Sequence, residues 1–395
     1  MILFLDLLLL ALSLPVLAGA SYLFGATLLS RRPKARTPGE AQRRFRFVVP
    51  AHNESSGIAA TVQSLKGVDY PAALFDVLVV ADNCEDDTAE QARAAGAVVL
   101  ERQDRERRGK GYALLLAFSQ LPADVDAVAV VDADSLVSPN ILKAFAARRE
   151  RGAAAVQADY AVRNPNAAWR TRLIAIAFGA FHIVRSRARE RLGLSCGLRG
   201  NGMCFSAELL SKIPHEAFSI VEDVEYGIRL GEAGYRVHYA DEAHVYGEMV
   251  STSTAAGSQR RRWEEGRKAL VRRNGLRLLR AGIARRDPLL FDLALDLLLP
   301  PLSRIAVLSV LGAIAALALS FAAHGVVLSS LSFGYCVLAV VAYVLRGWSV
   351  SGTGFRGLFD LGLAPVYVLW KASLRFRRAA RPTSSWVRTK REQSD

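Results

Sequence analysis

Hydrophobic positions along the chain follow two patterns. Long apolar stretches lie near both ends, at residues 2–29 and about 289–345, whereas the middle, about 45–286, holds only short apolar runs between polar turns. A helix needs about 20 apolar residues to cross a bilayer, so the long stretches predict membrane spans. The middle predicts the strands and helices of a soluble unit.

Four short apolar runs in the middle predict β-strands: FRFVVPA, FDVLVVADN, AVVLER and DAVAVVDAD. Helical patterns lie between them: ESSGIAATVQSL, DDTAEQARAAG and KGYALLLAFSQL. Strands that are apolar throughout and alternate with helices are typical of a parallel sheet covered on both faces. We therefore expect an α/β fold with a doubly wound, mainly parallel sheet.

The N-terminal apolar stretch is either an uncleaved anchor or a signal peptide. An Ala-x-Ala-like site is present at Ala18 and Ala20, but no basic region precedes the stretch, which continues to Leu29. We therefore expect an anchor. Seven basic residues follow within residues 31–46. The positive-inside rule then places the N-terminus outside and the following chain in the cytoplasm, at the inner membrane.

The C-terminal region predicts two crossings, at about 305–323 and 331–345. The stretch 355–370 is either a third crossing or an amphipathic surface helix. The tail from Lys371 has eight basic and two acidic residues and belongs in the cytoplasm, which favours an even number of C-terminal crossings.

These patterns divide the chain into six expected segments. They are an N-terminal transmembrane helix at 1–30, a basic linker at 31–44, a cytosolic α/β domain at 45–258, basic and amphipathic interface helices at 259–300, two transmembrane helices at 301–347, and an amphipathic or third membrane segment with a basic tail at 348–395.

Composition narrows the class of protein. The chain has 51 Lys and Arg against 37 Asp and Glu, a net charge of +14, and 51% of its residues are hydrophobic. Such an excess of basic residues indicates binding to nucleic acid, to an anionic membrane surface or to an anionic substrate. The basic clusters flank membrane segments and lack interleaved aromatic residues, so we expect no nucleic-acid partner. The four cysteines show neither a CxxC pattern nor zinc spacing.

Acidic side chains follow three of the four predicted strands: Glu54, Asp82, and the pair Asp132 and Asp134. Ligands of open α/β sheets bind outside the carboxyl ends of the strands, where these residues would converge. Gathered carboxylates repel one another unless a cation or hydrogen-bond donors neutralise them. Asp132 and Asp134 therefore predict a Mg²⁺ or Mn²⁺ site that a phosphate completes, although acids are also common in turns.

Two further motifs begin helices. Lys110 lies between two glycines in RRGKGYALLLAF, where a helix N-terminus favours anions; a solvated loop lysine is the alternative. Glu222 and Asp223 open SIVEDVEYGIRLGEAGYRV. One of these acids is a candidate general base. The alternative is that both acids only stabilise the helix by interacting with the positive end of its dipole.

A third motif, QRRRWEEGR, places Gln259, Arg262 and Trp263 on one helical face. An amide, a guanidinium and an indole together suit a diphosphate and a sugar ring. The alternative is a basic helix that lies on anionic lipid, and both interpretations can hold for different faces.

In order, PAHNE, ADNCEDDT, RGKG, DAD, VED and QRRRW resemble the membrane-bound inverting glycosyltransferases of family 2, the group of cellulose synthase, hyaluronan synthase and ceramide glucosyltransferase. The resemblance covers about 45–263 and implies the glycosyltransferase A type of nucleotide-sugar fold. Val221 stands where cellulose synthases have Thr, which speaks against that subfamily.

The resemblance implies a role for each motif. The UDP-sugar donor is expected to contact Glu54, Asp82, Lys110, Asp132, Gln259, Arg262 and Trp263. The divalent cation, Mg²⁺ or Mn²⁺, is expected on Asp132 and Asp134. Asp223 of the Glu222–Asp223 pair is the expected catalytic base, which accepts the proton of the acceptor hydroxyl in a displacement that inverts the anomeric carbon.

Three functions remain open at this point. The first is transfer of one sugar to a lipid or another membrane-associated acceptor; the second is processive synthesis of an exported polysaccharide. Three firm crossings make a poor polymer channel, which favours the first. The third is a nucleotide-binding scaffold without turnover. A Rossmann dehydrogenase is excluded because PAHNESSG, rather than G-x-G-x-x-G, follows the first strand. The Gly-rich GLSCGLRGNGMCF resembles an acceptor-side loop, with a tight connection into a strand as the alternative.

Overall fold

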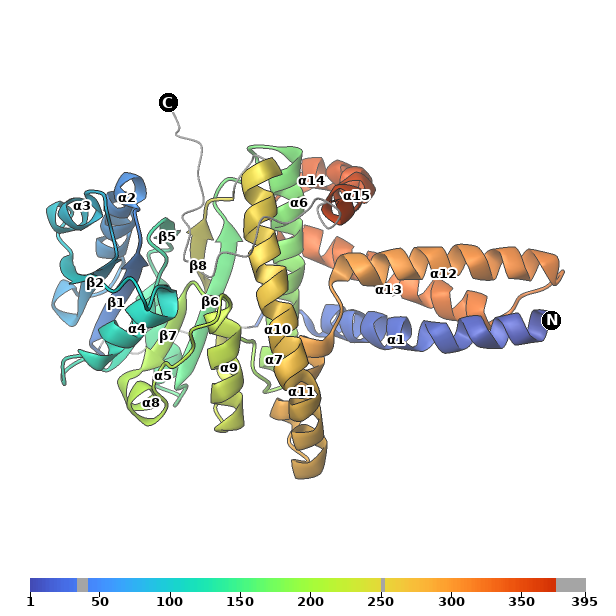
Figure 1. The fold of residues 1–395 in the computed structure, drawn as a ribbon, viewed down its shortest axis with the longest axis horizontal. Helices are drawn as coiled ribbons and strands as arrows, with labels where there is room; N and C mark the ends of the chain where they lie inside the picture. Colours follow the sequence, from blue (N-terminus) through green and yellow to red (C-terminus); the bar gives the residue numbers. More distant parts are fainter. Residues whose placement is uncertain (34–41, 250–252, 374–395) are drawn as a thin grey trace.

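A computed structural model of the chain describes residues 1–33, 42–249 and 253–373, and for 253–263 and 371–373 it describes the backbone alone. An α/β domain forms one end of the molecule, and a bundle of long helices projects from it (Figure 1). The functional residues expected from the sequence belong to the α/β domain and to the helix that follows it.

The domain is built on one eight-stranded sheet in the order β3-β2-β1-β4-β7-β6-β8-β5. Its strands are β1 (Phe45–Ala51), β2 (Phe75–Asp82), β3 (Val98–Arg102), β4 (Ala127–Val130), β5 (Ser135–Val137), β6 (Ala155–Val162), β7 (Met203–Ser206) and β8 (Val237–Gly247). β1 runs parallel to β2 and β4, and β7 is antiparallel to β4 and β6. The expected mixed, mainly parallel sheet is confirmed. β4 ends at Val130, so the acidic pair lies in a loop beyond the strand.

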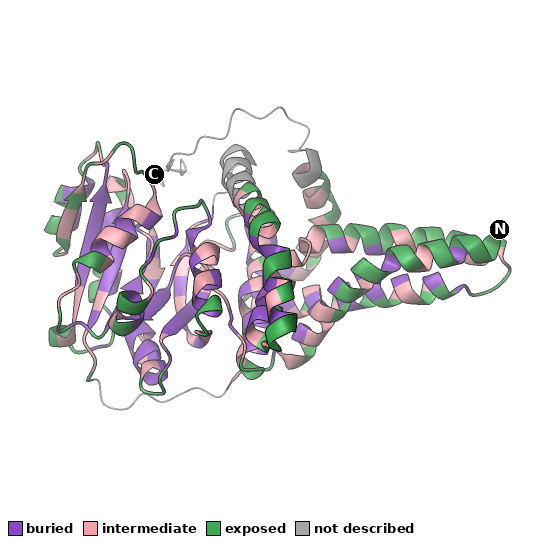
Figure 2. Cartoon of the chain, turned by 60° about the horizontal axis from the view of Figure 1, so that its bottom comes forward, coloured by how far each residue is buried: buried purple, intermediate pink, exposed green. Residues whose placement is uncertain are grey.

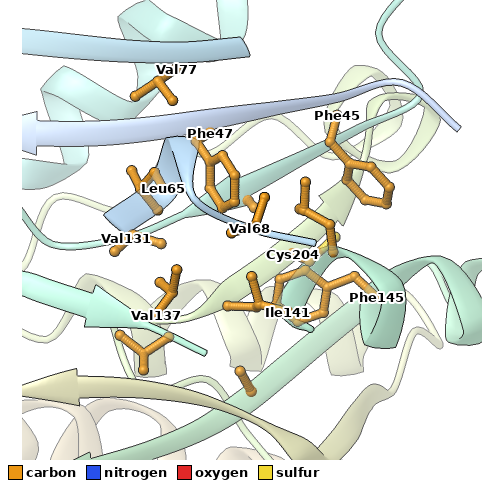
Figure 3. Packing of buried hydrophobic residues seen from close by; sticks show 14 of the residues in the cluster. Phe45, Phe47, Leu65, Val68, Val77, Val131, Val137, Ile141, Phe145 and Cys204 are labelled. Carbon is orange, nitrogen blue, oxygen red and sulfur yellow. The ribbon is translucent and has the colours of Figure 1, made fainter. Parts of the chain in front are cut away.

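Helices cover both faces of this sheet. They are α2 (Ser55–Lys66), α3 (Thr88–Ala94), α4 (Lys110–Ser119), α5 (Ile141–Arg149), α6 (Trp169–Phe178), α7 (Arg185–Arg191), α8 (Ala207–Lys212) and α9 (Glu222–Glu232), with short turns η1 (Ala72–Leu74) and the π-helical η2 (Gly179–Val184). On one face, Phe45 and Phe47 of β1 pack with Leu65 of α2 and with Ile141 and Phe145 of α5 (Figure 3). On the other face α4, α8 and α9 pack against the sheet.

In the described part of the chain, three helices are long and apolar enough to cross a membrane: α1 (Ile2–Leu29), α12 (Leu302–Ala322) and α13 (Leu328–Val350). Their outward surfaces carry many exposed residues (Figure 2), as expected of helices that meet lipid. The stretch 355–370 instead forms short helices, α14 (Gly354–Asp360), η3 (Leu361–Leu363) and α15 (Ala364–Ser373). Among the described residues, none of these short helices is long and apolar enough to be a candidate span. The chain is thus built to associate with a membrane.

Asp6 is an acidic residue inside the first apolar helix, and it has a structural partner. Its carboxylate accepts hydrogen bonds from the backbone N–H groups of Leu328 (3.1 Å) and Ser329 (2.9 Å) at the start of α13. Free N–H groups at a helix N-terminus need acceptors, above all in lipid, where water is absent. Asp6 therefore caps α13 and ties α1 to the start of that helix.

A buried ionic cluster joins the bundle to the domain through α10 (Ser253–Arg285) and α11 (Pro288–Leu298). Arg189 of α7 lies 3.1 Å from Asp292 and 3.0 Å from Asp296, both on α11, and Asp296 also pairs with Arg185. Tyr22 of α1 donates its hydroxyl to Asp292 at 3.3 Å. These interactions fix the long helices against the α/β domain, because breaking one pair would leave a buried charge.

Candidate active site

The carboxyl ends of β1, β2 and β4 meet at one edge of the sheet, because these neighbouring strands run parallel. Glu54 follows β1 and stands at the start of α2. Its backbone N–H donates to the Thr88 hydroxyl at 2.8 Å, which ties the first turn to the loop after β2. The edge is the place where an open α/β sheet binds ligands.

Asp82 ends β2 and is only 1% exposed. One carboxylate oxygen, Oδ1, accepts from Arg102 at 2.6 Å and from the Asn83 amide at 3.1 Å. The other oxygen, Oδ2, is buried and has no hydrogen-bond partner among the residues that the structure describes. A buried acceptor without a donor is costly, so this oxygen is suited to a ligand N–H or O–H.

The loop that carries Asp132 and Asp134 is held by Asn201. The Asn201 side-chain oxygen accepts from the Asp132 backbone N–H at 3.1 Å, and its amide nitrogen donates to the Ser135 hydroxyl at 2.8 Å. The Ser135 hydroxyl in turn lies 3.1 Å from Asp134 Oδ1. Asn201 is 1% exposed. One buried side chain therefore fixes the backbone on both sides of the acidic pair.

Lys110 lies at the centre of the edge. Its Nζ donates to Asp132 Oδ1 at 2.5 Å and to the carbonyl oxygen of Gly200, and lies 3.7 Å from Glu222 Oε1. Burial acts to lower the pKa of Lys110, but Asp132, Glu222 and Asp223 outweigh it and raise the pKa. The lysine therefore stays charged and neutralises the gathered carboxylates. The alternative of a solvated loop lysine is wrong, since the side chain is only 16% exposed.

Glycines on either side of Lys110 explain its placement. Gly109 has φ 137°, in the region that L side chains rarely adopt. A Cβ at Gly111 would lie 2.0 Å from the carbonyl oxygen of Ala217. Only glycine permits this contact between α4 and the segment that leads to α9. Next to it, Tyr112 stacks on Phe218 with ring centroids 4.2 Å apart.

Glu222 and Asp223 open α9 beside this lysine. Burial raises the pKa of Glu222 to about 8, and Lys110 acts in the opposite direction. Burial also raises the pKa of Asp223, while Lys110 and Arg199 act to lower it. Glu222 is 8% exposed and Asp223 is half-buried. Near neutral pH such a pair holds a proton on one member and leaves the other able to accept one.

The acidic pair of the loop offers oxygen ligands. No group of three His, Cys, Asp or Glu side chains that would enclose a metal occurs within residues 1–33, 42–249 and 264–370. Mg²⁺ is usually bound by one or two carboxylates, with substrate phosphates and waters as its other ligands. Two carboxylates on a fixed loop match that pattern, so Asp132 and Asp134 fit a cation that arrives with a phosphate.

Gln259, Arg262 and Trp263 lie within α10, as the helical spacing predicted. Their side chains fall outside the described residues. In the described part of α10, Gly266 packs against Val221 at the start of α9, where a Cβ on this glycine would lie 3.1 Å from the valine side chain. The helix therefore passes directly behind the start of α9.

Gln157 and Asn201 support the site, and no sequence motif had assigned a supporting role to either residue. Gln157 is 1% exposed; its amide donates to the Asn201 carbonyl oxygen at 2.7 Å, and its oxygen accepts from the Arg199 N–H at 2.9 Å. The glutamine thus holds the loop 199–202, whose Gly200 and Gly202 have φ of 76° and 70°. A glutamine within the apolar run of β6 was the available signal. Cys204, in the same Gly-rich stretch, is a core residue of β7.

Comparison with known proteins agrees with this architecture. The chain is 24% identical over 250 residues to "Probable glycosyltransferase YdaM" of Bacillus subtilis, covering 60% of this chain and 59% of that protein. It is 29% identical over 228 residues to a beta-monoglucosyldiacylglycerol synthase of Trichormus variabilis, covering 56% and 48%. The chain thus spans about half to three-fifths of these relatives' lengths.

Among solved structures, a mannosyltransferase of Pyrobaculum calidifontis in complex with GDP-Man and Mn²⁺ matches with a TM-score of 0.53 and 18% identity. The match covers 86% of this chain and 98% of that one and shows a shared fold. The family described as Glycosyltransferase like family 2 matches residues 42–266, more than half of the chain. The chain therefore belongs to glycosyltransferase family 2.

Proposed function

We propose that the protein transfers a sugar from a nucleotide-sugar, a UDP-sugar, to a lipid acceptor at the cytoplasmic face of the inner membrane, with inversion at the anomeric carbon. The observation that carries the proposal is the position of Lys110, which contacts Asp132 and Gly200 and lies beside Glu222. This arrangement links the loop after β4, where the donor is expected, to the start of α9, where the general base is expected.

The nucleotide would lie between the ends of β1 and β2. The unpartnered Oδ2 of Asp82 supports this position, because a uracil ring carries an imide N–H that such an acceptor can bind. Arg102 orients the carboxylate through its 2.6 Å contact with Oδ1. Glu54 lies at the neighbouring strand end.

Asp132 and Asp134 would hold a Mg²⁺ or Mn²⁺ ion together with the donor diphosphate. When bound, the cation stabilises the negative charge that builds on the departing diphosphate. Lys110 supplies a second positive charge at the same place, already positioned by its backbone contact to Gly200. In the donor complex we expect Asp132 to exchange part of its contact with Lys110 for the cation.

Asp223 would act as the general base. Burial raises the pKa of Glu222 to about 8, and Asp223 beside it is the member of the pair that we assign as proton acceptor. Burial raises the pKa of Asp223 above that of an ordinary carboxylate, which strengthens it as a proton acceptor. Asp223 takes the proton of the acceptor hydroxyl, and that oxygen attacks the anomeric carbon as the bond to the diphosphate breaks.

Two observations support a lipid acceptor. The three apolar helices would hold the active site close to a bilayer. The relatives from cyanobacteria are named as synthases of a glucosyl lipid. Three crossings also offer little room for a polymer channel within one chain.

The test is a transfer assay with membranes that contain the protein and with labelled UDP-sugars, in Mn²⁺ or Mg²⁺ and in EDTA. We expect a label that extracts with lipid, that EDTA abolishes and that added cation restores. A high-molecular-weight product that resists lipid extraction would instead indicate a polysaccharide synthase. Activity that EDTA leaves unchanged would contradict the role of Asp132 and Asp134.

A further inference from the structure

A cavity of about 360 Å³ lies where the α/β domain meets the ends of α1 and α13. One wall is formed by β6 and β8 of the sheet. The other wall is formed by α6, by η2 and by residues 350–352 at the end of α13, and Arg32 reaches it from the segment after α1. The cavity therefore lies at the boundary between the soluble domain and the expected bilayer.

The sheet wall is polar. The Asp241 carboxylate accepts hydrogen bonds from Nε and Nη2 of Arg187, at 2.6 and 3.0 Å. It also lies 3.4 Å from Nε of Arg32. Asp159 lies 3.0 Å from His244 Nδ1 and accepts from a tyrosine hydroxyl of β8 at 3.2 Å. The opposite wall is mainly apolar, with the side chains of Ala175, Phe178, Ile183 and Val350 beside Ser351 and two glycines.

The charges that line the cavity balance one another. Two carboxylates, Asp159 and Asp241, line the cavity together with two guanidiniums, Arg32 and Arg187. Asp159 and Asp241 are 2% and 4% exposed. A ligand with its own net charge would have to be buried here without a counter-charge, which is costly. Hydroxyl groups both donate and accept, so they suit such a wall.

Tyr160 connects the cavity to the active site. It lines the cavity, and the Asn201 side chain is hydrogen-bonded to its hydroxyl. The pKa of Tyr160 is raised mainly by burial and also by the negative charge of Asp132. A Cβ at Gly247 would come within 2.6 Å of this hydroxyl, so a glycine leaves room for it. The inner end of the cavity thus adjoins the loop proposed to hold the cation.

The membrane side of the cavity is rigid. A Cβ at Gly179 would lie 2.5 Å from the carbonyl oxygen of Gly347, and the Tyr343 hydroxyl donates to the carbonyl of Ala180 at 2.7 Å. Both contacts clamp the π-helical turn η2 to α13. Such turns are frequent at functional sites.

We propose that this cavity binds the polar head of an uncharged, hydroxyl-bearing lipid. The head contacts the sheet wall, and the acyl chains leave past Val350 along α13. The inference rests on the proposed function, because this lipid would be the acceptor of the sugar. Binding of the lipid can nevertheless be measured without sugar transfer.

Binding is tested with a photoreactive diacylglycerol and the full-length protein in phosphatidylcholine nanodiscs. We expect adducts on β6, β8, η2 or residues 350–352. Val350→Trp and Ile183→Trp, which fill the apolar wall from two sides, should each lower capture at least tenfold. Val341→Trp lies on the same helix but at an exposed position, and should change capture less than twofold.

Three results would overturn the inference: wild-type adducts elsewhere, undiminished capture by both filled variants, or preferential capture of a photoreactive phosphatidic acid. UDP binding by each variant shows that the donor site is folded. If either variant fails to fold, the wild-type adduct map decides. Capture without any sugar transfer by the wild type would leave the cavity assignment intact and contradict the proposed function instead.

Discussion

Lys110 Nζ lies 2.5 Å from Asp132 Oδ1, so the protein itself places a positive charge beside the acids of the site. Lys110→Met should leave Asp132, Glu222 and Asp223 without that charge and raise the pKa of both acids of α9. We expect transfer to fall at least a hundredfold, because charge stabilisation in such sites contributes about 10²–10³ in rate. Initial rates at saturating donor measure the loss.

Lys110→Arg serves as the control for that prediction. It keeps the charge but cannot place a compact ammonium between Asp132 and the Gly200 carbonyl, so we expect a partial loss. Equal activity of the Met variant and the wild type would contradict the assignment.

Asn201 should govern the affinity for the cation. Asn201→Ala removes the acceptor for the Asp132 N–H and the donor to Ser135. We expect the Mn²⁺ concentration for half-maximal activity to rise about tenfold, with a loss of stability of about 1–3 kcal/mol. Asn140→Ala, which also breaks two hydrogen bonds but at the start of α5, is the matched control. A similar Mn²⁺ shift in both variants would show that Asn201 has only a structural role.

The sequence predicted the framework well, because apolar strands that alternate with helices leave few arrangements open. The strand pattern predicted that Asp132 lies at this edge, and the family resemblance added Lys110 and the Glu222–Asp223 pair; the structure brings Lys110, Asp132 and Glu222 together. It did not predict Asn201 or Gln157 as supports, because a lone buried amide has no pattern in sequence and its partners lie 42 to 69 positions away.

The sequence also left 355–370 open between a span and a surface helix. The structure divides that stretch after Asp360 and after Leu363 into three short helical elements, and the mean apolar character of the stretch did not indicate this division. Asp6 could not be interpreted from sequence, since its partners lie more than 300 residues away at the start of α13. Residues whose roles depend on long-range pairing are those that sequence patterns miss.

Glu222 should make stability depend on pH. Its pKa is raised from 4.5 to about 8 on folding, so the folded chain binds the proton more tightly than the unfolded chain. This contribution is complete below about pH 4.5 and is lost as pH rises to about 8. Glu222→Gln removes the titration, so its melting temperature relative to wild type should increase from pH 5 to pH 8.5.

Thermal unfolding in one detergent across that pH range measures the difference. Glu225→Gln, on the same turn of α9, controls for the loss of an acid at the helix start. A constant difference between Glu222→Gln and wild type would show that Glu222 is not protonated in the folded chain at neutral pH.

Asp6 should stabilise the helical bundle. Asp6→Ala leaves the N–H groups of Leu328 and Ser329 without acceptors, and the loss of a helix cap costs about 1 kcal/mol. We expect a lower melting temperature in detergent, whereas Asp6→Asn, which can still accept from one N–H, should lose less. Equal melting temperatures of Asp6→Ala and wild type would mean that other groups cap α13.

The most direct test of the proposed mechanism is the Asp223→Asn variant, assayed for UDP binding and for sugar transfer in the presence of Mn²⁺. The amide keeps the shape of the side chain but cannot accept the proton of an acceptor hydroxyl. The account predicts UDP affinity within about threefold of wild type and transfer reduced at least a thousandfold, as expected when an essential base is lost. Transfer within tenfold of wild type would show that Asp223 is not the base.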